Sequence, residues 1–552
     1  MRILLDIETT LDHSKIWCVV TKDLDTNEVK VWKEAKDLSE YIKAASLIVA
    51  HNGIAFDFYL LNKLWKCQIT LRRVKDTLVL SRLVNPSLDG GHSLGNLGNL
   101  LGIQKSEFYD FDLQTKTLEE MVQYCIQDVE VLHRIYNYLE AELKRQEFST
   151  KSQELEHEVQ TIIAVQERNG FKFNESSAMQ LLAELKAKLD AITTEMQRIF
   201  PPRITTGRTH KTTGKPLKDI IEPFNPGSRQ QIAERLIEKG WKPEKYTEKG
   251  SVIVDETTLE GIDIPEAKAI AEYLMLQKRI AQIESWMEHT KPDGRVHGKV
   301  ITNGAVTGRM THHSPNMAQV PNSGAIYGPE CRNLWTVEKG CKLVGIDASG
   351  LELRMLAHYM NDNEYTNEVI SGDIHTANQK AAGLETRNQA KTFIYAFLYG
   401  AGAAKIGKIV GGSSKEGQKL INNFLRNTPK LERLRERVSK AFIERGVLLG
   451  LDGRKLLVRS EHSALNTLLQ GAGAIVMKKA LILLYKDLTN RKIPFKLVAN
   501  VHDEIQCETP EQYAELVGQL GVQAIADAGK HFNMNCALTG EYKIGLTWRD
   551  TH

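Results

Sequence analysis

The pattern of apolar residues changes twice along the chain, and this limits the possible folds more than any other feature of the sequence. Strand-like runs cover residues 3–6, 16–21 and 47–50, and helical periodicity follows over residues 118–142. Long charged amphipathic helices are predicted over residues 155–287, and strands alternate with helices after Val300. Since a chain of 552 residues is too long to form a single hydrophobic core, we predict a compact α/β domain followed by a larger multidomain α/β region.

Composition favours a soluble intracellular protein. Apolar residues make up 42% of the chain, charged residues make up 26%, and no low-complexity tract is present. Arg2, Asp6 and Glu8 interrupt any signal-peptide core, and we expect no apolar run long enough to span a bilayer. The seven scattered cysteines form no CxxC pair, which argues against a disulfide framework and against a zinc site. The net charge of +3 does not bear on nucleic-acid binding.

Three segments near the N-terminus carry acidic residues at spacings that suit a metal site. Asp6 and Glu8 are two apart on a predicted strand and therefore point to the same face. Asp57 ends the segment His-Asn-Gly-Ile-Ala-Phe-Asp, which follows another predicted strand, and Tyr124 and Asp128 are four apart on a predicted helix. Each segment alone fits solvated surface charges. Together they offer the carboxylate oxygens that Mg²⁺ prefers, and a two-metal site of this kind hydrolyses phosphodiesters.

A second acidic group lies in the C-terminal half. An apolar strand delivers Asp347 to its end, where a turn through Gly350 starts a helix. Asp503 and Glu504 stand between apolar residues in a predicted tight turn. Either segment alone could be a charged hairpin tip, but converging buried carboxylates repel each other unless a cation separates them. The pair therefore predicts a second Mg²⁺ site.

A helix predicted over residues 387–399 lies between these two segments. Arg387, Lys391 and Tyr395 are spaced four apart and drift only about 40° per step around the helix. The resulting stripe of two cations and an aromatic ring suits a triphosphate followed by a sugar and a base, although a solvated face is an alternative. Phe393, Phe397 and Leu398 are predicted to lie in the core.

The N-terminal segments resemble the three motifs of the DEDDy exonucleases, the proofreading domains of DNA polymerases. Order and spacing match throughout. The resemblance implies an RNase H-like fold with two metal ions, which are bound by Asp6, Glu8, Asp57 and Asp128. It further implies that Tyr124 orients the attacking water.

The C-terminal half resembles family A DNA polymerases, the DNA polymerase I family, and in particular the replicative type of short-tailed bacteriophages. The matching segments are residues 303–321, 347–358, 386–402, 451–474 and 501–506. The resemblance implies that two Mg²⁺ ions, for which Mn²⁺ is an expected substitute, are held by Asp347, Asp503 and the carbonyl of Ala348. The residues implied to contact the incoming dNTP are Arg387, Lys391, Tyr395, His375 and Glu352. Those implied to contact primer-template DNA are Tyr399, Arg309, Asn466, Gln470 and His502.

Some of these implied roles are more specific. Lys391 and Glu504 count among the catalytic residues, and Glu504 lies beside the metal site. Glu352 crowds the 2′ side of the sugar, which favours DNA over RNA synthesis. Tyr395 occupies the position at which members of the family contact the 3′ side of the nucleotide sugar, so we expect ready incorporation of dideoxynucleotides.

The resemblance implies a right-hand architecture after the exonuclease. We expect the exonuclease over residues 1–148, thumb and palm entry over 149–300, palm over 301–365, fingers over 366–448 and palm over 449–552. The predicted function is template-directed DNA synthesis by two-metal phosphoryl transfer during phage replication, with 3′-5′ proofreading. The alternative is an exonuclease with an inactive polymerase half. A single-subunit RNA polymerase would lack the nuclease and Glu352, and a non-catalytic scaffold would not need complete metal sites.

The region between the long helices departs from the family pattern. The best-known phage relatives carry a long thumb insertion that captures thioredoxin, whereas the corresponding region here, about residues 200–224, is short, so we do not expect thioredoxin dependence. Residues 198–218 contain no acidic side chain and are predicted to form an exposed loop. Its basic residues are Arg198, Arg203, Arg208, Lys211, Lys215 and Lys218. They could grip duplex phosphate or simply be solvated. A replicative helicase-primase is a further candidate partner, and the expected location is the cytoplasm of the host cell if a phage encodes the chain.

Overall fold

A five-stranded sheet forms the centre of the N-terminal region in the computed structural model, which describes residues 1–104, 117–210 and 212–552. The strand order is β3-β2-β1-β4-β5, in which β1 is antiparallel to β2 and parallel to β4. The strands are β1 (Arg2–Thr9), β2 (Ile16–Asp23), β3 (Val29–Trp32), β4 (Leu47–Ala50) and β5 (Val74–Asp76). The helices are α1 (Ala35–Ala44), α2 (Asp57–Leu64), η1 (Leu71–Arg73), α3 (Thr77–Val84), α4 (Leu94–Leu100) and α5 (Leu118–Arg145).

Helix α5 covers one face of this sheet. A capping box formed by Thr117 and Glu120 starts the helix. Cys125, Val129 and Leu132 then pack on apolar side chains of β1, β2 and β4. The predicted strands and the predicted helix over residues 118–142 are therefore confirmed.

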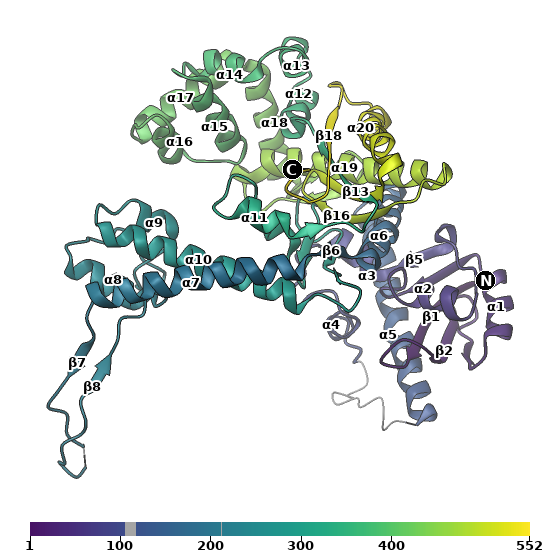
Figure 1. Ribbon diagram of the computed structural model, residues 1–552. Coiled ribbons are helices and arrows are strands. Elements are labelled where there is room, and N and C mark those ends of the chain that lie inside the picture. Colours follow the sequence, from purple (N-terminus) through teal and green to yellow (C-terminus); the bar gives the residue numbers. More distant parts are fainter. Residues whose placement is uncertain (105–116, 211) are drawn as a thin grey trace.

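Two long helices, α7 (Glu175–Ile199) and α10 (Pro265–Glu288), run side by side away from the rest of the molecule (Figure 1). At their far end lie α8 (Arg229–Glu238), α9 (Glu256–Glu260) and a hairpin of β7 (Arg203–Thr205) and β8 (Ile220–Glu222). The basic stretch predicted to be a loop is thus partly strand, because Arg203, Ile204 and Thr205 pair with Glu222, Ile221 and Ile220. Its exposure is as predicted, and Lys211 lies outside the described residues.

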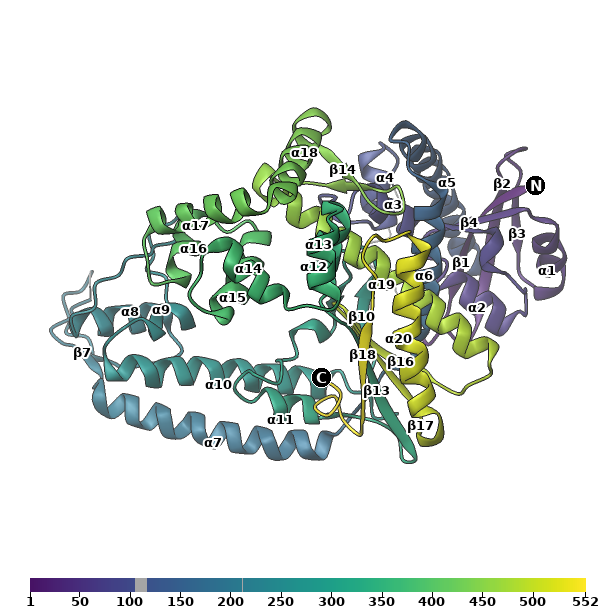
Figure 2. The same cartoon turned by 90° about the horizontal axis from the view of Figure 1, so that it is seen from above.

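A four-stranded antiparallel sheet of order β16-β17-β13-β18 forms the centre of the C-terminal half. Its strands are β13 (Cys341–Ala348), β16 (Lys496–Val501), β17 (Glu504–Pro510) and β18 (Gly540–Gly545). Helices α6 (Thr150–Asn169), α12 (Leu351–Met360), α19 (Ala464–Asn490) and α20 (Ala514–His531) pack around it. Figure 2 shows this sheet between the exonuclease-like domain and a separate group of helices.

The separate helical group and the short elements complete the fold. The group consists of α13 (Asn363–Ile370), α14 (Ile374–Ala382), α15 (Arg387–Leu398), α16 (Ala403–Ile409), α17 (Ser414–Asn427) and α18 (Pro429–Arg445). The short strands are β6 (Phe171–Phe173), β9 (Arg295–Val296), β10 (Lys299–Ile301), β11 (Thr311–His313), β12 (Trp335–Thr336), β14 (Val447–Leu449) and β15 (Lys455–Leu457). The short helices are η2 (Met317–Gln319), α11 (Gly328–Asn333), η3 (Glu461–Ser463) and η4 (Glu511–Tyr513).

Helix α19 corrects one expectation from the sequence. Among the described residues, the helical stretch Glu461–Asn490 is long and apolar enough to cross a membrane, whereas no such run was expected. Its most apolar 18-residue window is 83% buried inside the protein. The helix is apolar all round because α6, α12, α18, α20 and the strands β14 and β15 surround it.

Candidate active sites

The N-terminal acidic residues come together beside the C-terminal half of β1. Asp6 and Glu8 point to the same face of the strand, and ligand atoms of Asp6, Glu8 and Cys125 lie within 4.8 Å of one another. Asp57, at the start of α2, is 3% exposed. Burial, followed by the nearby carboxylate of Asp6, raises the pKa of Asp57 well above its ordinary value. A divalent cation would relieve this repulsion, so the donor set fits Mg²⁺.

Helix α5 supplies the remaining residues predicted for this site. Asp128 is buried and Tyr124, one turn earlier, is half-buried on the same side of the helix. The Sγ atom of Cys125 donates to the carboxylate of Asp6 over 3.3 Å. Burial raises the pKa of the Cys125 thiol well above its ordinary value, so it remains a donor.

Asp76 fixes the segment that carries Asp57, and sequence reasoning missed it. This carboxylate is 1% exposed and accepts hydrogen bonds from the backbone N–H groups of Asn52 and Ile54, at 2.9 and 3.0 Å. Gly53 lies between these two donors, and a Cβ there would meet the Cβ of Ala50 at 2.6 Å. The tight turn therefore requires glycine.

The C-terminal acidic residues meet at one end of β13 and β17, the two central strands of the antiparallel sheet. Asp347 is paired with Glu504 between β13 and β17, and the N–H of Ala348 donates to the carbonyl of Asp503 over 3.3 Å. Although the Asp347 side chain is exposed, partial burial of its carboxyl group, with the nearby carboxylates of Glu504 and Asp503, raises the pKa of Asp347 to about 6. Burial also raises the pKa of Asp503. These carboxylates therefore fit a divalent cation as well.

Glu504 is directed toward the C-terminal segment. The indole Nε1 of Trp548 donates to Oε1 of Glu504 over 2.6 Å, and Nδ1 of His552 lies 2.7 Å from Oε2. Burial opposes ionisation, but these contacts and one from Gln506 lower the pKa of Glu504. Glu504 is thus a fixed negative charge beside Asp347.

Glu352 lies at the start of α12 and joins α15 to the acidic site. The hydroxyl of Tyr399 donates to both Glu352 oxygens, at 3.0 and 2.9 Å. The guanidinium of Arg309 lies 3.3 Å from the Glu352 carboxylate and 3.9 Å from that of Asp503. The structure therefore brings Arg309, Glu352 and Tyr399 together with Asp503.

The stripe on α15 is present as predicted. A capping box formed by Thr386 and Gln389 starts the helix, Arg387 and Lys391 are exposed, and Tyr395 is half-buried. The ring of Tyr395 lies 6.4 Å from that of His375 on α14 and 6.5 Å from that of Tyr399.

The core residues predicted for the same helix are buried, and the stripe has one partner that the sequence did not reveal. Phe393, Phe397 and Leu398 all lie in the core. The carboxylate of Asp373, which caps α14, accepts from Nε of Arg387 over 2.7 Å.

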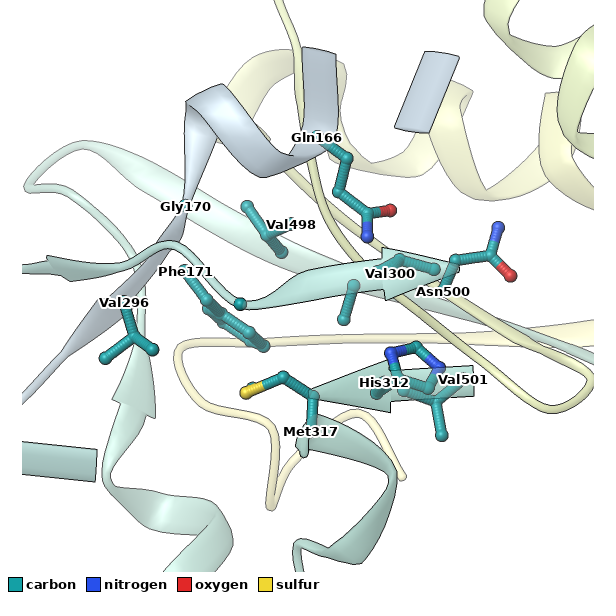
Figure 3. A pocket seen from close by; sticks show the side chains of 12 residues that line it. Gln166, Gly170, Phe171, Val296, Val300, His312, Met317, Val498, Asn500 and Val501 are labelled. Carbon is teal, nitrogen blue, oxygen red and sulfur yellow. The ribbon is translucent and has the colours of Figure 1, made fainter. Parts of the chain in front are cut away.

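The remaining residues predicted to contact DNA are Asn466 and Gln470 on α19 and His502, which precedes Asp503. Asn466 and Gln470 are half-buried, one turn apart on α19. His502 is exposed and has a left-handed φ of 56°, which sharpens the turn before Asp503. Figure 3 shows a pocket lined by Val498, Asn500 and Val501 of β16 and by Gln166 and His312, among others. Its volume of about 10 Å³ matches one water molecule, so it cannot hold a nucleotide.

Comparisons with known proteins match both halves. Residues 7–144 match the family described as 3′-5′ exonuclease, and residues 203–550 match DNA polymerase family A. The DNA-directed DNA polymerase of Escherichia phage T7 is 36% identical over 98% of this chain and 98% of its own length. That of Enterobacteria phage T3 is 36% identical over 93% of this chain and 94% of its own.

More distant relatives agree. DNA polymerase I of Aquifex aeolicus is 28% identical over 99% of this chain and 95% of its own length. A solved structure, the POL domain of Pol1 from M. smegmatis in complex with DNA primer-template and dNTP, has a TM-score of 0.82 at 18% identity. The match covers 100% of this chain and 96% of that one, which shows a shared fold.

Proposed function

Because this chain belongs to family A of the DNA polymerases and carries a 3′-5′ exonuclease domain, we propose that it extends primers at Asp347 and Asp503 and removes mispaired ends beside Asp6 and Asp57. The enzyme is a DNA-directed DNA polymerase, and its family is metal-dependent. The observation that carries the proposal is the convergence of acidic residues at two separate places. Glu8 and Asp57 lie within residues 7–144, with Asp6 immediately before that range, and Asp347 and Asp503 lie within residues 203–550.

The polymerase residues position and neutralise the substrates. When bound, Mg²⁺ would lower the pKa of the attacking hydroxyl and neutralise the leaving pyrophosphate. Asp347, Asp503 and the carbonyl of Ala348 would hold two such ions. Arg387, Lys391 and His375 would bind the phosphates of the dNTP, with Tyr395 beside its sugar and base. Their exposure on one face of α15 and α14 supports this arrangement.

Four further side chains would act on the sugar and the DNA. Glu352, held by Tyr399 and Arg309, would exclude a 2′-hydroxyl. Asn466, Gln470 and Arg309 would contact the minor groove of the primer-template, where acceptors common to A·T and G·C pairs allow contact without sequence preference.

The exonuclease residues would cut the phosphodiester with water as the nucleophile. Asp6, Glu8, Asp57 and Asp128 would hold two Mg²⁺ ions, and Mn²⁺ would substitute at both sites. Tyr124 would orient the water, and its position one turn from Asp128 supports this role.

The architecture supports a division into an exonuclease and a right hand. We assign residues 1–148 to the exonuclease and 149–300 to the thumb and palm entry. Residues 301–365 and 449–552 form the palm, and 366–448, the region of α13 to α18, form the fingers. Closure of the fingers on a correct dNTP is the expected conformational step.

The partners are primer-template DNA and dNTPs, and the enzyme would work in the cytoplasm of its host cell. The hairpin of β7 and β8 takes the place of a long thioredoxin-capturing insertion, so we propose that processivity does not depend on thioredoxin. A replicative helicase-primase is a partner that only the family resemblance suggests.

A primer-extension assay tests the proposed function. The native chain is mixed with a labelled primer-template and either Mg²⁺ or EDTA, with and without dNTPs. We expect extension with dNTPs, shortening without them, and neither reaction in EDTA. Shortening without extension under all conditions would instead support the alternative of a nuclease with an inactive polymerase half.

A further inference from the structure

Helix α6 lies between the two proposed active sites and contacts both halves of the protein (Figures 1 and 2). Glu156 points to the polymerase half, where it forms ion pairs of 2.6 Å with Arg454 and with Lys478 of α19. The next residue, His157, points to the exonuclease domain and is 6% exposed. Neighbouring side chains of one helix are thus anchored in different domains.

His157 accepts a hydrogen bond from the exonuclease domain. The backbone N–H of Asp76 donates to Nε2 of His157 over 2.9 Å. The other ring nitrogen, Nδ1, lies 2.7 Å from the carbonyl of Gln153, which can only accept. The ring is therefore neutral, with its hydrogen on Nδ1 and a lone pair on Nε2 that accepts from Asp76. Burial lowers the pKa of His157, which favours this neutral form.

Asp76 passes this constraint on to the loop that carries Asp57. The backbone of Asp76 is held by His157, and its carboxylate accepts from the N–H groups of Asn52 and Ile54. These donors precede Asp57 by five and three residues. A shift of Asp76 would therefore move the loop and, with it, the Asp57 carboxylate.

A second contact from α6 holds the other side of Asp57. The guanidinium of Arg168 lies 4.0 Å from the centre of the Tyr59 ring on α2. Helix α2 begins at Asp57, so the segment is held before Asp57 by Asp76 and after it by Tyr59. Two points on one helix of the polymerase half, His157 and Arg168, thus constrain the position of Asp57.

We propose that His157 is a positioning residue for the exonuclease, through which helix α6 of the polymerase half fixes Asp76 and the loop that carries Asp57. This inference rests on the proposed exonuclease function. It makes nuclease activity dependent on a contact that an isolated exonuclease domain would lack.

Two substitutions of similar size separate the two hydrogen bonds of His157. In His157→Gln the side-chain oxygen reaches the place of Nε2 and can accept from the N–H of Asp76. In His157→Asn the shorter amide reaches only the place of Nδ1, so it keeps the bond to Gln153 and loses the bond to Asp76. Degradation of a labelled single strand is measured in Mg²⁺ with the full chain. We expect His157→Gln to stay within about threefold of native kcat and His157→Asn to fall about tenfold or more, with KM little changed.

The result that would overturn the inference is an equal loss of kcat in both variants, or no loss in either. Primer extension reports on folding and should stay within about twofold in both. If the native chain itself does not degrade DNA, the proposed exonuclease function fails, and this outcome is distinct from equal behaviour of the two variants. If His157→Asn does not fold, hydrogen exchange of the native chain decides. The amides of Asn52, Ile54 and Asp76 should be protected, and rapid exchange at Asp76 would overturn the inference.

Discussion

Four charged side chains are buried together where α6 meets α19, and they allow a stability prediction. Glu156 pairs at 2.6 Å with both Arg454 and Lys478, and Arg454 also pairs at 2.6 Å with Asp452. None of these side chains is more than 3% exposed. The two cations and two anions balance, so removal of one charge leaves another uncompensated in the core.

Glu156→Gln removes one anion from this group. Because both cations remain buried, we expect a loss of about 3–5 kcal/mol in the free energy of unfolding. In the double variant Glu156→Gln with Lys478→Met, Arg454 and Asp452 remain as a neutral pair. It should recover to within about 1–2 kcal/mol of the native protein, which gives a coupling of several kcal/mol between the two sites.

The assay is guanidinium unfolding followed by fluorescence of the buried Trp335 and Trp548. A pH series adds an independent check. Burial lowers the pKa of Lys478 to about 8, so the native lysine loses its proton before the unfolded one. The native free energy of unfolding should therefore rise relative to Lys478→Met as pH increases from about 8 to about 10.5, by at most about 3 kcal/mol. If the double variant loses as much free energy of unfolding as Glu156→Gln and Lys478→Met lose separately in sum, the reasoning is refuted.

Three further predictions concern the polymerase site. Asp373→Asn frees Arg387 from an exposed ion pair, and the amide oxygen of the new side chain can still cap α14. Steady-state kinetics should therefore show that the KM for dNTP falls by up to about fivefold. A higher KM would contradict this prediction. Tyr395→Phe should raise the preference for deoxy- over dideoxynucleotides in competition assays about tenfold or more, about 1.4 kcal/mol, and an unchanged ratio would remove Tyr395 from that role. Asp347→Asn removes a carboxylate that its neighbours repel and whose pKa is raised to about 6. Calorimetry in EDTA at pH 8 should therefore show a higher free energy of unfolding for the variant. Because solvent screens the exposed Asp347, we expect a gain of only about 1 kcal/mol. That gain in unfolding free energy should disappear below about pH 4, where the native carboxyl is protonated in both the folded and the unfolded protein. A lower melting temperature for Asp347→Asn than for the native protein at pH 8 would contradict the prediction.

Local periodicity was enough to predict much of both sites. Asp6 and Glu8 follow from strand alternation, and Tyr124 and Asp128 follow from helix geometry, because such side chains share a face wherever the element forms. The stripe of Arg387, Lys391 and Tyr395 was predictable for the same reason.

The residues that the sequence did not reveal act over long separations. Asp76 contacts a loop that precedes it by more than twenty residues, and its partner His157 lies 81 residues further along the chain. No local pattern marks Asp76, because the loop that it contacts is distant in the sequence, and none marks His157, because its contact exists only when two domains are packed together. Arg387 was predicted, but its pairing with Asp373 depends on how α14 packs against α15.

Two expectations about single segments were incomplete. No apolar run of membrane-spanning length was expected, and the basic stretch was expected to be a loop, although Arg203–Thr205 form a strand. A helix that is buried on all sides has the composition of a membrane span. In the hairpin, Ile204, Ile220 and Ile221 are exposed, so burial does not give the strands the alternation by which sequence reasoning detects them.

The central claim is that one chain holds two separate metal-dependent sites, and one gel tests it most directly. Native chain, Asp503→Ala and Asp6→Ala are each incubated with a labelled primer-template and Mg²⁺, with and without dNTPs. The account predicts that extension is lost only in Asp503→Ala and that shortening is lost only in Asp6→Ala. If Asp503→Ala still extends the primer, or if either substitution abolishes both reactions in a folded protein, the assignment of two independent active sites is wrong.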